Sequence, residues 1–179
     1  MKKMKNFIVL IFLGSILLSC KNDKSKVMNH IVNSEIGYDV SEEGEKRTLL
    51  AGPMSNVEVW EKYIKAHNER DIETIMNMNG EDFKARGPRG EYIVGSEAHK
   101  EFLMEWFKAN SPMWSSKYFI ANDVKTKEGK LIQWVTSGHD LTLSVDGNQM
   151  NVFQIHDARI EDGKVQEFLV HERVKGEGE

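Results

Sequence analysis

Apolar residues recur every three or four positions in three stretches between residues 55 and 110, which predicts three amphipathic helices. The first helix is expected to begin at Ser55, because Ser55 and Glu58 have the spacing of a capping box. Its inward stripe is predicted to carry Val57, Trp60, Ile64 and His67, with Tyr63 beside that stripe. Asp71 is the expected N-cap of the second helix. The third opens after Gly95 and ends before Pro112.

From residue 114 onward the apolar pattern changes to alternation, which predicts strands. Four long strands are expected over residues 115–126, 131–145, 149–161 and 164–174, and a minor pair over 82–86 and 91–94. Asp146-Gly147 and Asp162-Gly163 are typical of tight hairpins. The sequence therefore predicts an α+β fold, cone-shaped, with three N-terminal helices packed on a curved, mostly antiparallel sheet that has a small extra strand pair.

The N-terminus has the pattern of an exported lipoprotein. Three lysines precede an apolar stretch over residues 7–18, which is shorter than the roughly 20 residues that a membrane-spanning helix needs. The stretch ends in Leu17-Leu18-Ser19-Cys20, which resembles a lipobox. We expect a lipoprotein signal peptide over 1–19 and a lipid anchor on Cys20 that holds the protein on the membrane of a bacterial cell envelope, on the periplasmic or surface side. The alternative is an ordinary secretory signal with an incidental cysteine.

Composition narrows the remaining possibilities. Residues 20–53 are expected to be the lipidated cysteine and a tether, of which a short segment could lie against the domain; residues 54–174 are the domain and 175–179 a polar tail. The net charge of −4 and the lack of a basic cluster argue against nucleic acid as a partner. Because Cys20 is the only cysteine, an internal disulfide and a cysteine-based zinc site are excluded. No cofactor is predicted.

The order of elements resembles the nuclear transport factor 2-like superfamily, which includes ketosteroid isomerases and SnoaL-like polyketide cyclases. The resemblance covers about 54–174. It is carried by Tyr63-Ile64 eight residues before Asp71-Ile72-Glu73, by Gly95 with Glu97, and by Asp162-Gly163-Lys164-Val165. These residues form caps, turns and core positions, so they imply the fold and say little about chemistry.

The resemblance implies three catalytic groups in a ketosteroid isomerase. Tyr63 matches the family's tyrosine on the first helix. The family's general base falls on Gly87, before Pro88, and its second acid falls near Ile155. A glycine cannot abstract a proton and an isoleucine cannot donate one. We therefore expect no isomerase chemistry of that kind, and a buried, structural Tyr63 is the simpler interpretation.

If the two Asp-Gly pairs form two-residue turns, the register sorts the strand residues into two faces. The face richer in aromatic and aliphatic side chains is assigned to the concave side, although a bulge at Gly138 would swap part of this register. The pocket-lining candidates are Trp60, Tyr63, Trp134, Phe153, Ile155, Phe168 and Val170. Asp140 and Glu172 are expected in one row of this face, about 10 Å apart.

Two carboxylates beside an apolar pocket could divide the roles of acid and base, so Tyr63, Asp140 and Glu172 are the catalytic candidates of an alternative, enzymatic hypothesis. The simpler alternative is that both acids lie at the rim, solvated or paired with Arg159 or Arg173.

On the other face, assigned to the convex side, His139 and Gln154 are expected in one row with His171, and His156 lies one step along. His139 and His171 would lie two strands apart, too far for one zinc ion, so no metal site is predicted. A half-polar face of this kind could form a homodimer.

Three hypotheses for the function follow. The first is a membrane-tethered domain whose pocket binds a small apolar or amphipathic molecule without chemistry. The second is an acid/base enzyme, of isomerase, cyclase or hydrolase type, on a small organic substrate. The third is a dimeric interaction protein.

Overall fold

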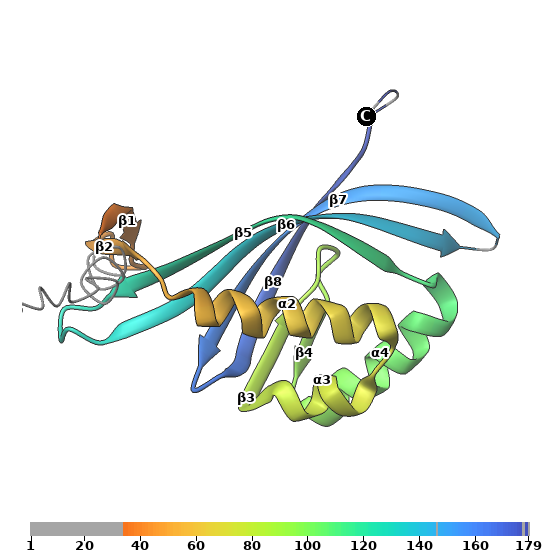
Figure 1. The fold of residues 1–179 in the computed structure, drawn as a ribbon, viewed down its shortest axis with the longest axis horizontal. Coiled ribbons are helices and arrows are strands. Elements are labelled where there is room, and N and C mark those ends of the chain that lie inside the picture. Colours follow the sequence, from red (N-terminus) through yellow and green to blue (C-terminus); the bar gives the residue numbers. More distant parts are fainter. Residues whose placement is uncertain (1–33, 146, 177, 179) are drawn as a thin grey trace, which may run out of the picture.

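The computed structural model describes residues 34–145, 147–176 and 178. One eight-stranded sheet curves around three helices, and its strand order is β1-β2-β5-β6-β7-β8-β3-β4 (Figure 1). All neighbouring strands are antiparallel except β3 and β8, which are parallel. This arrangement confirms the predicted α+β class.

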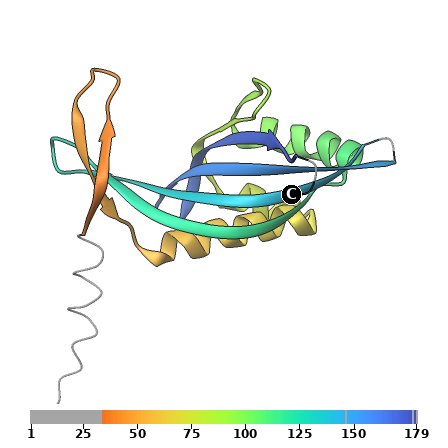
Figure 2. The ribbon, with the colours of Figure 1, turned by 90° about the horizontal axis from the view of Figure 1, so that it is seen from above.

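The helices are α2 (Met54–Glu69), α3 (Ile72–Met78) and α4 (Ser96–Asn110). The strands are β1 (Glu35–Val40), β2 (Lys46–Ala51), β3 (Asn79–Arg86), β4 (Tyr92–Val94), β5 (Met113–Lys125), β6 (Leu131–Val145), β7 (Asn148–Glu161) and β8 (Lys164–Val174). The long strands arch over the helices, and the β1–β2 hairpin stands at one end of the sheet (Figures 1 and 2).

The helix starts agree with the sequence in one case and differ in another. The Asp71 side chain accepts a hydrogen bond from the Thr74 amide, as its predicted N-cap role requires. The predicted capping box at Ser55 is wrong, because α2 begins one residue earlier with Pro53 as its N-cap and without a side-chain cap bond. The predicted inward stripe of α2 is confirmed, since its four residues are buried, as is Tyr63 beside them.

Part of the stretch expected to be a flexible tether forms regular structure. Residues 35–51 fold into the β1–β2 hairpin. Strand β2 pairs with β5, with Leu49 opposite Val124 and Ala51 opposite Asn122. The signal peptide and Cys20 lie outside the described residues. Among the helices of the described chain, none is both long and apolar enough to span a membrane.

The β6–β7 hairpin has the predicted register over its whole length, from Gln133 opposite Ile160 to Val145 opposite Asn148. No bulge interrupts this pair at Gly138.

The β7–β8 hairpin departs from the predicted register after two pairs. Ile160 lies opposite Val165, but Arg159 lies opposite Glu167, so Gln166 is an extra residue in β8. Such a β-bulge reverses the face on which every later residue of the strand lies, relative to its cross-strand partners.

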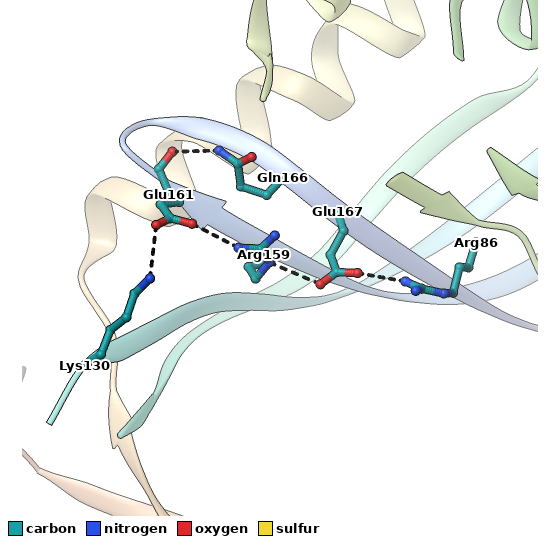
Figure 3. A network of polar contacts seen from close by, with 6 residues as sticks. All are labelled: Arg86, Lys130, Arg159, Glu161, Gln166 and Glu167. Atoms are coloured by element: carbon teal, nitrogen blue, oxygen red, sulfur yellow. Dashed lines mark hydrogen bonds and ion pairs between the residues drawn. The ribbon is translucent and has the colours of Figure 1, made fainter. Parts of the chain in front are cut away.

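A polar network lies beside this bulge (Figure 3). The Gln166 side chain donates to the Glu161 carbonyl, while Glu167 accepts from Arg159 Nε at 3.1 Å and from Arg86 Nη1 at 2.8 Å. Since Arg86 belongs to β3 and Arg159 to β7, Glu167 links both neighbours of β8 on the face away from the helices.

The predicted faces of β6 and β7 are wrong, although the register between these two strands is right. Trp134, Asp140, Phe153 and Ile155 were expected on the concave side, but they lie on the opposite face. The side covered by the helices instead carries Val135, Ser137, His139, Leu141, Leu143, Val152, Gln154, His156, Ala158 and Ile160, all of them buried. The prediction failed because it followed the larger aromatic side chains, whereas the covered face combines aliphatic residues with polar ones that are hydrogen-bonded.

One buried acid opposes the stability of the fold. Asp123 in β5 is 1% exposed, its Oδ1 has no hydrogen-bond partner among the described residues, and its Oδ2 accepts only from Gln133, at 3.4 Å. Burial raises the pKa of Asp123 above its usual value.

We predict that Asp123→Asn increases the free energy of unfolding at neutral pH, because the neutral amide avoids the cost of burying a charged carboxylate. Because a raised pKa means that the folded state holds the proton more tightly, the penalty in the native protein grows as pH rises above about 4. Urea unfolding at several pH values should show a gain that increases with pH. Asp82→Asn, at an exposed position, is the control, and an equal gain from it would contradict the explanation.

Candidate functional site

A cavity of about 230 Å³ lies between the helices and the concave side of the sheet. Its apolar lining includes six aromatic side chains, which are Trp60, Tyr63, Phe102, Trp106, Trp114 and Phe168. The polar side chains that line it are His67, Arg89, Glu91, His99, Asn110, Gln154, His156 and Glu172. Pockets for drug-sized ligands measure roughly 300–1,000 Å³, so this cavity suits a smaller molecule.

Four of the seven predicted pocket residues line this cavity: Trp60, Tyr63, Phe168 and Val170. Trp60 and Tyr63 come from α2, whose stripe faces the sheet, and Phe168 and Val170 come from β8 beyond the bulge. Trp134, Phe153 and Ile155 do not line it, because they lie on the opposite face of the sheet.

The structure separates the two acids proposed for proton transfer. Asp140 lies on the convex face, where Lys117 at 2.7 Å and Lys175 at 2.5 Å pair with it. Hydrogen bonds from these two lysines lower the pKa of Asp140. Glu172 lines the cavity with a side chain that is 12% exposed. The two carboxylates therefore cannot act on one substrate.

Glu172 is instead the outer end of a buried hydrogen-bond chain. Gln154, its direct neighbour on β7, donates through Nε2 to Glu172 Oε2 at 2.8 Å. Gln154 Oε1 accepts from Trp114 Nε1 at 2.9 Å and lies 2.9 Å from His156 Nε2. Because a carboxylate only accepts and an indole only donates, both ends of the Gln154 amide are fixed, and His156 Nε2 must carry a proton.

This assignment leaves one ring nitrogen of His156 without a partner. His156 is 4% exposed, and its Nδ1 has no hydrogen-bond partner among the described residues. Burial, the largest cause, holds the pKa of His156 well below its usual value, so the ring is neutral at pH 7. Nδ1 then carries a bare lone pair, and buried acceptors of this kind are rare.

Tyr63 is not available for catalysis in this arrangement. Its hydroxyl donates to Asn79 Oδ1 at 2.6 Å and lies 3.5 Å from His99 Nδ1. Asn79 Nδ2 in turn donates to Ser96 Oγ at 3.0 Å. Burial raises the pKa of Tyr63 well above its usual value. These contacts fit the structural role expected for a buried tyrosine.

The other buried histidines are neutral as well. His67 Nδ1 donates to the Tyr63 carbonyl at 2.8 Å, and His139 contacts the Ser116 and Ser137 hydroxyls at 3.0 and 2.7 Å. Burial lowers the pKa of His67 to about 4, and it lowers the pKa of His139 to the same value. His67 was expected at the edge of the core and is buried; His139 was expected on the convex face and lies beneath α2.

At the mouth of the cavity, Arg89 lies between two carboxylates. Its guanidinium pairs with Glu172 at 3.3 Å, and its backbone N–H donates to Glu91 Oε2 at 2.9 Å. Gly87, where the family's base was expected, also lines the cavity. A Cβ at Gly87 would lie 2.3 Å from Glu91 Oε2. The carboxylate of Glu91 thus occupies the space in which a side chain at position 87 would begin.

The convex face offers no metal site and retains exposed apolar surface. His171 lies there, opposite Ile155, and so does not join His139 and His156, whose ring centroids are 4.5 Å apart on the covered face. Within the part of the chain that is described, no group of three or more potential ligands could hold a metal ion. Tyr118 and Ile120 are exposed; the homodimer through this face stays a prediction.

Sequence reasoning missed the cavity roles of Gln154, His156 and Arg89. The first two could have been found, because Gln154 and His156 alternate along β7 in step with Val152 and Ile160. Apolar residues on the same face of the strand indicate that this face is covered. Arg89 lies in a glycine- and proline-rich turn, and no pattern in the sequence points from that turn to Glu172.

Comparison with solved structures supports the fold. A candidate ketosteroid isomerase from Kribbella flavida aligns with a TM-score of 0.57 and 17% identity, covering 72% of this chain and 85% of that one. An NTF2-like protein of unknown function from Burkholderia pseudomallei aligns at 0.54 and 16%, covering 65% and 89%. A candidate SnoaL-like polyketide cyclase from Shewanella denitrificans aligns at 0.54 and 12%, covering 66% and 90%.

No protein-family model matches the chain, and no curated protein matches it in sequence. The structural neighbours include ketosteroid isomerase-like, SnoaL-like and NTF2-like proteins, as the sequence motifs predicted. At these identities the likeness concerns the fold and not the activity.

Acid sensitivity follows from the buried histidines. Burial lowers the pKa of His99 to about 3. As pH falls below about 6.5, the unfolded chain binds protons that the folded protein does not bind, so the free energy of unfolding decreases.

We predict that in His99→Phe the free energy of unfolding decreases less steeply as pH falls, while Asn79 keeps its bonds to Ser96 and Tyr63. The check is the urea midpoint as a function of pH. His171→Gln, at an exposed site, is the control, and a pH profile unchanged by His99→Phe would contradict this account.

Proposed function

We propose that the domain binds a small, largely apolar molecule in its cavity and acts without chemistry on it. The observation that carries the proposal is the cavity itself, which is open between helices and sheet and is lined mainly by aromatic and aliphatic side chains. Cavities of this composition, with a few convergent polar groups, are the usual sites for small ligands. A cavity filled by its own side chains would not support this function.

Binding is favoured over catalysis because the proposed acid/base groups are not together. Asp140 is on the other face and paired with two lysines. The Tyr63 hydroxyl is engaged with Asn79. Glu172, the remaining member, is held by Gln154 and Arg89.

The proposal includes a tether. In it, Cys20 carries the lipid and holds the domain at a membrane of the bacterial cell envelope, on the periplasmic or surface side. The support is the leader sequence, with its lysines, its short apolar stretch and its lipobox-like end. The fourteen positions from residue 20 to residue 34 can span at most about 50 Å when fully extended.

Filling the cavity should weaken binding. We predict that Val170→Phe weakens binding of ethylphenol, a neutral one-ring probe, at least about tenfold, because the added ring occupies the space that the probe needs. Isothermal titration calorimetry on the full-length protein measures this affinity. Leu169→Phe adds the same ring to the next position, which lies on the opposite face opposite Asp157, and should leave binding unchanged. Equal losses in both variants, or no saturable binding to the native protein, would contradict the proposed function.

The tether has its own test. We predict that the native chain incorporates labelled palmitate in bacterial cells and fractionates with membranes, and that Cys20→Ala abolishes both. A Ser19→Ala variant, which keeps a small residue before the cysteine, is the matched control. Membrane association that persists in Cys20→Ala would refute anchoring through this cysteine.

A further inference from the structure

The β1–β2 hairpin carries an exposed apolar row at the edge of the sheet. Ile36, Tyr38 and Val40 take alternate positions of β1 and are 49%, 59% and 52% exposed. Strand β1 is the outermost strand of the sheet, and its hairpin stands at one end of it (Figures 1 and 2). Single exposed apolar residues are normal on a protein surface, but three within five positions form a patch that indicates an interaction.

The patch combines apolar bodies with polar tips. Val40 lies opposite Lys46 on β2, and the ammonium group of Lys46 is 4.2 Å from the centre of the Tyr38 ring. Tyrosine and lysine side chains of this kind are favoured where a lipid bilayer meets water, because the apolar part can enter the lipid while the tip stays hydrated.

The edge of the hairpin is unsuited to pairing with a strand of another chain. The register between β1 and β2 shifts between Glu35 and Gly37, so a bulge interrupts the edge strand. Further along the same strand, Asp39 forms an ion pair with Arg47. Bulges and charged side chains are the devices by which edge strands avoid association with other strands. The exposed row therefore suits a partner that contacts its side chains and adds no strand.

The place of the hairpin in the chain indicates which partner this is. The hairpin follows directly on the proposed tether, and the stretch from Cys20 to residue 34 spans at most about 50 Å when fully extended. A lipid on Cys20 would hold the hairpin within reach of the bilayer surface. A contact that is made within such a tethered molecule requires little affinity of its own.

Charge decides the kind of lipid surface. The turn of the hairpin contains Glu42, Glu43 and Glu45, of which Glu45 pairs with Lys127 at 2.5 Å. Unpaired acids are repelled by an anionic membrane surface. The contact therefore depends on the apolar row and suits zwitterionic headgroups.

We propose that the β1–β2 hairpin rests on the zwitterionic surface of the bilayer, with Ile36, Tyr38 and Val40 among the lipid headgroups. This inference rests on the tether of the proposed function. Leu143 and Met150, which line the cavity, flank the β6–β7 turn at the other end of the sheet (Figure 1). In this orientation that end of the cavity lies away from the bilayer.

Electron paramagnetic resonance of a nitroxide on the hairpin tests the contact. The full-length chain with Val40→Cys is produced in bacteria, labelled, and reconstituted into phosphatidylcholine vesicles; a lipid-bearing Cys20 has no thiol that could take the label. The reference is a label at Ile120→Cys, on the convex face of β5, where the native side chain is 49% exposed. The label at position 40 should collide with a water-soluble nickel chelate several-fold less often than the reference and with dissolved oxygen more often, because oxygen enters lipid and the chelate does not.

Two variants assign the contact to the apolar row. Tyr38→Asp, added to the chain labelled at position 40, should raise the chelate collisions to the level of the reference, because a carboxylate is excluded from lipid. Tyr118→Asp makes the same change at an exposed tyrosine of β5 and should leave the collisions at position 40 unchanged.

The outcomes separate this inference from the tether. If mass spectrometry shows lipid on Cys20 but the chelate reaches positions 40 and 120 equally, the membrane contact is overturned and the tether stands. A free thiol at Cys20 overturns the tether and this inference with it. Dipolar broadening between labels of neighbouring molecules would place a second copy on the row, and fewer chelate collisions after anionic phosphatidylglycerol is added would assign the contact to basic residues; either result overturns the proposal.

Discussion

The need to hydrogen-bond polar side chains beneath helix α2 is the constraint on which the rest of this structure depends. Trp60 Nε1 donates to Ser137 Oγ at 2.8 Å, and Ser137 contacts His139, which contacts Ser116. This chain of contacts joins the helix to β6 and β5 and orients Trp60 against the sheet. Since unsatisfied polar groups in an interior are costly, the helix can lie over this face of the sheet only where these partners meet.

The same constraint gives the cavity its chemistry. Gln154 is held by Trp114 on one side and Glu172 on the other, and this fixes the proton on His156 Nε2. The extra residue at Gln166 makes the arrangement possible, because it brings Glu172 to the covered face opposite Gln154. Without the bulge, the residue opposite Gln154 would be His171, and Glu172 would not face the cavity.

Much of the architecture could be predicted from the sequence, because it follows from local periodicity. The inward stripe of α2, the Asp71 cap and the β6–β7 register all depend on residues close together in the chain. The faces of the sheet could not be predicted in the same way. Phe153 and Gln154 alternate with equal regularity, and which of them is covered depends on where α2 packs.

The site shows the same division between local and distant information. Trp60 and Phe168 were identifiable as apolar residues of the correct elements. The pairing of Asp140 with Glu172 failed, because one added residue in β8 places Glu172 beside Gln154 instead of in the row of Asp140. The contact of Arg89 with Glu172 joins residues far apart in sequence, and only the folded chain brings them together.

The most direct test of the central claim is nitrogen NMR of the His156 imidazole in the native protein at neutral pH. Because Gln154 offers its oxygen to His156 Nε2, the account predicts a neutral ring that carries its proton on Nε2. A ring protonated at Nδ1, or at both nitrogens, would contradict it.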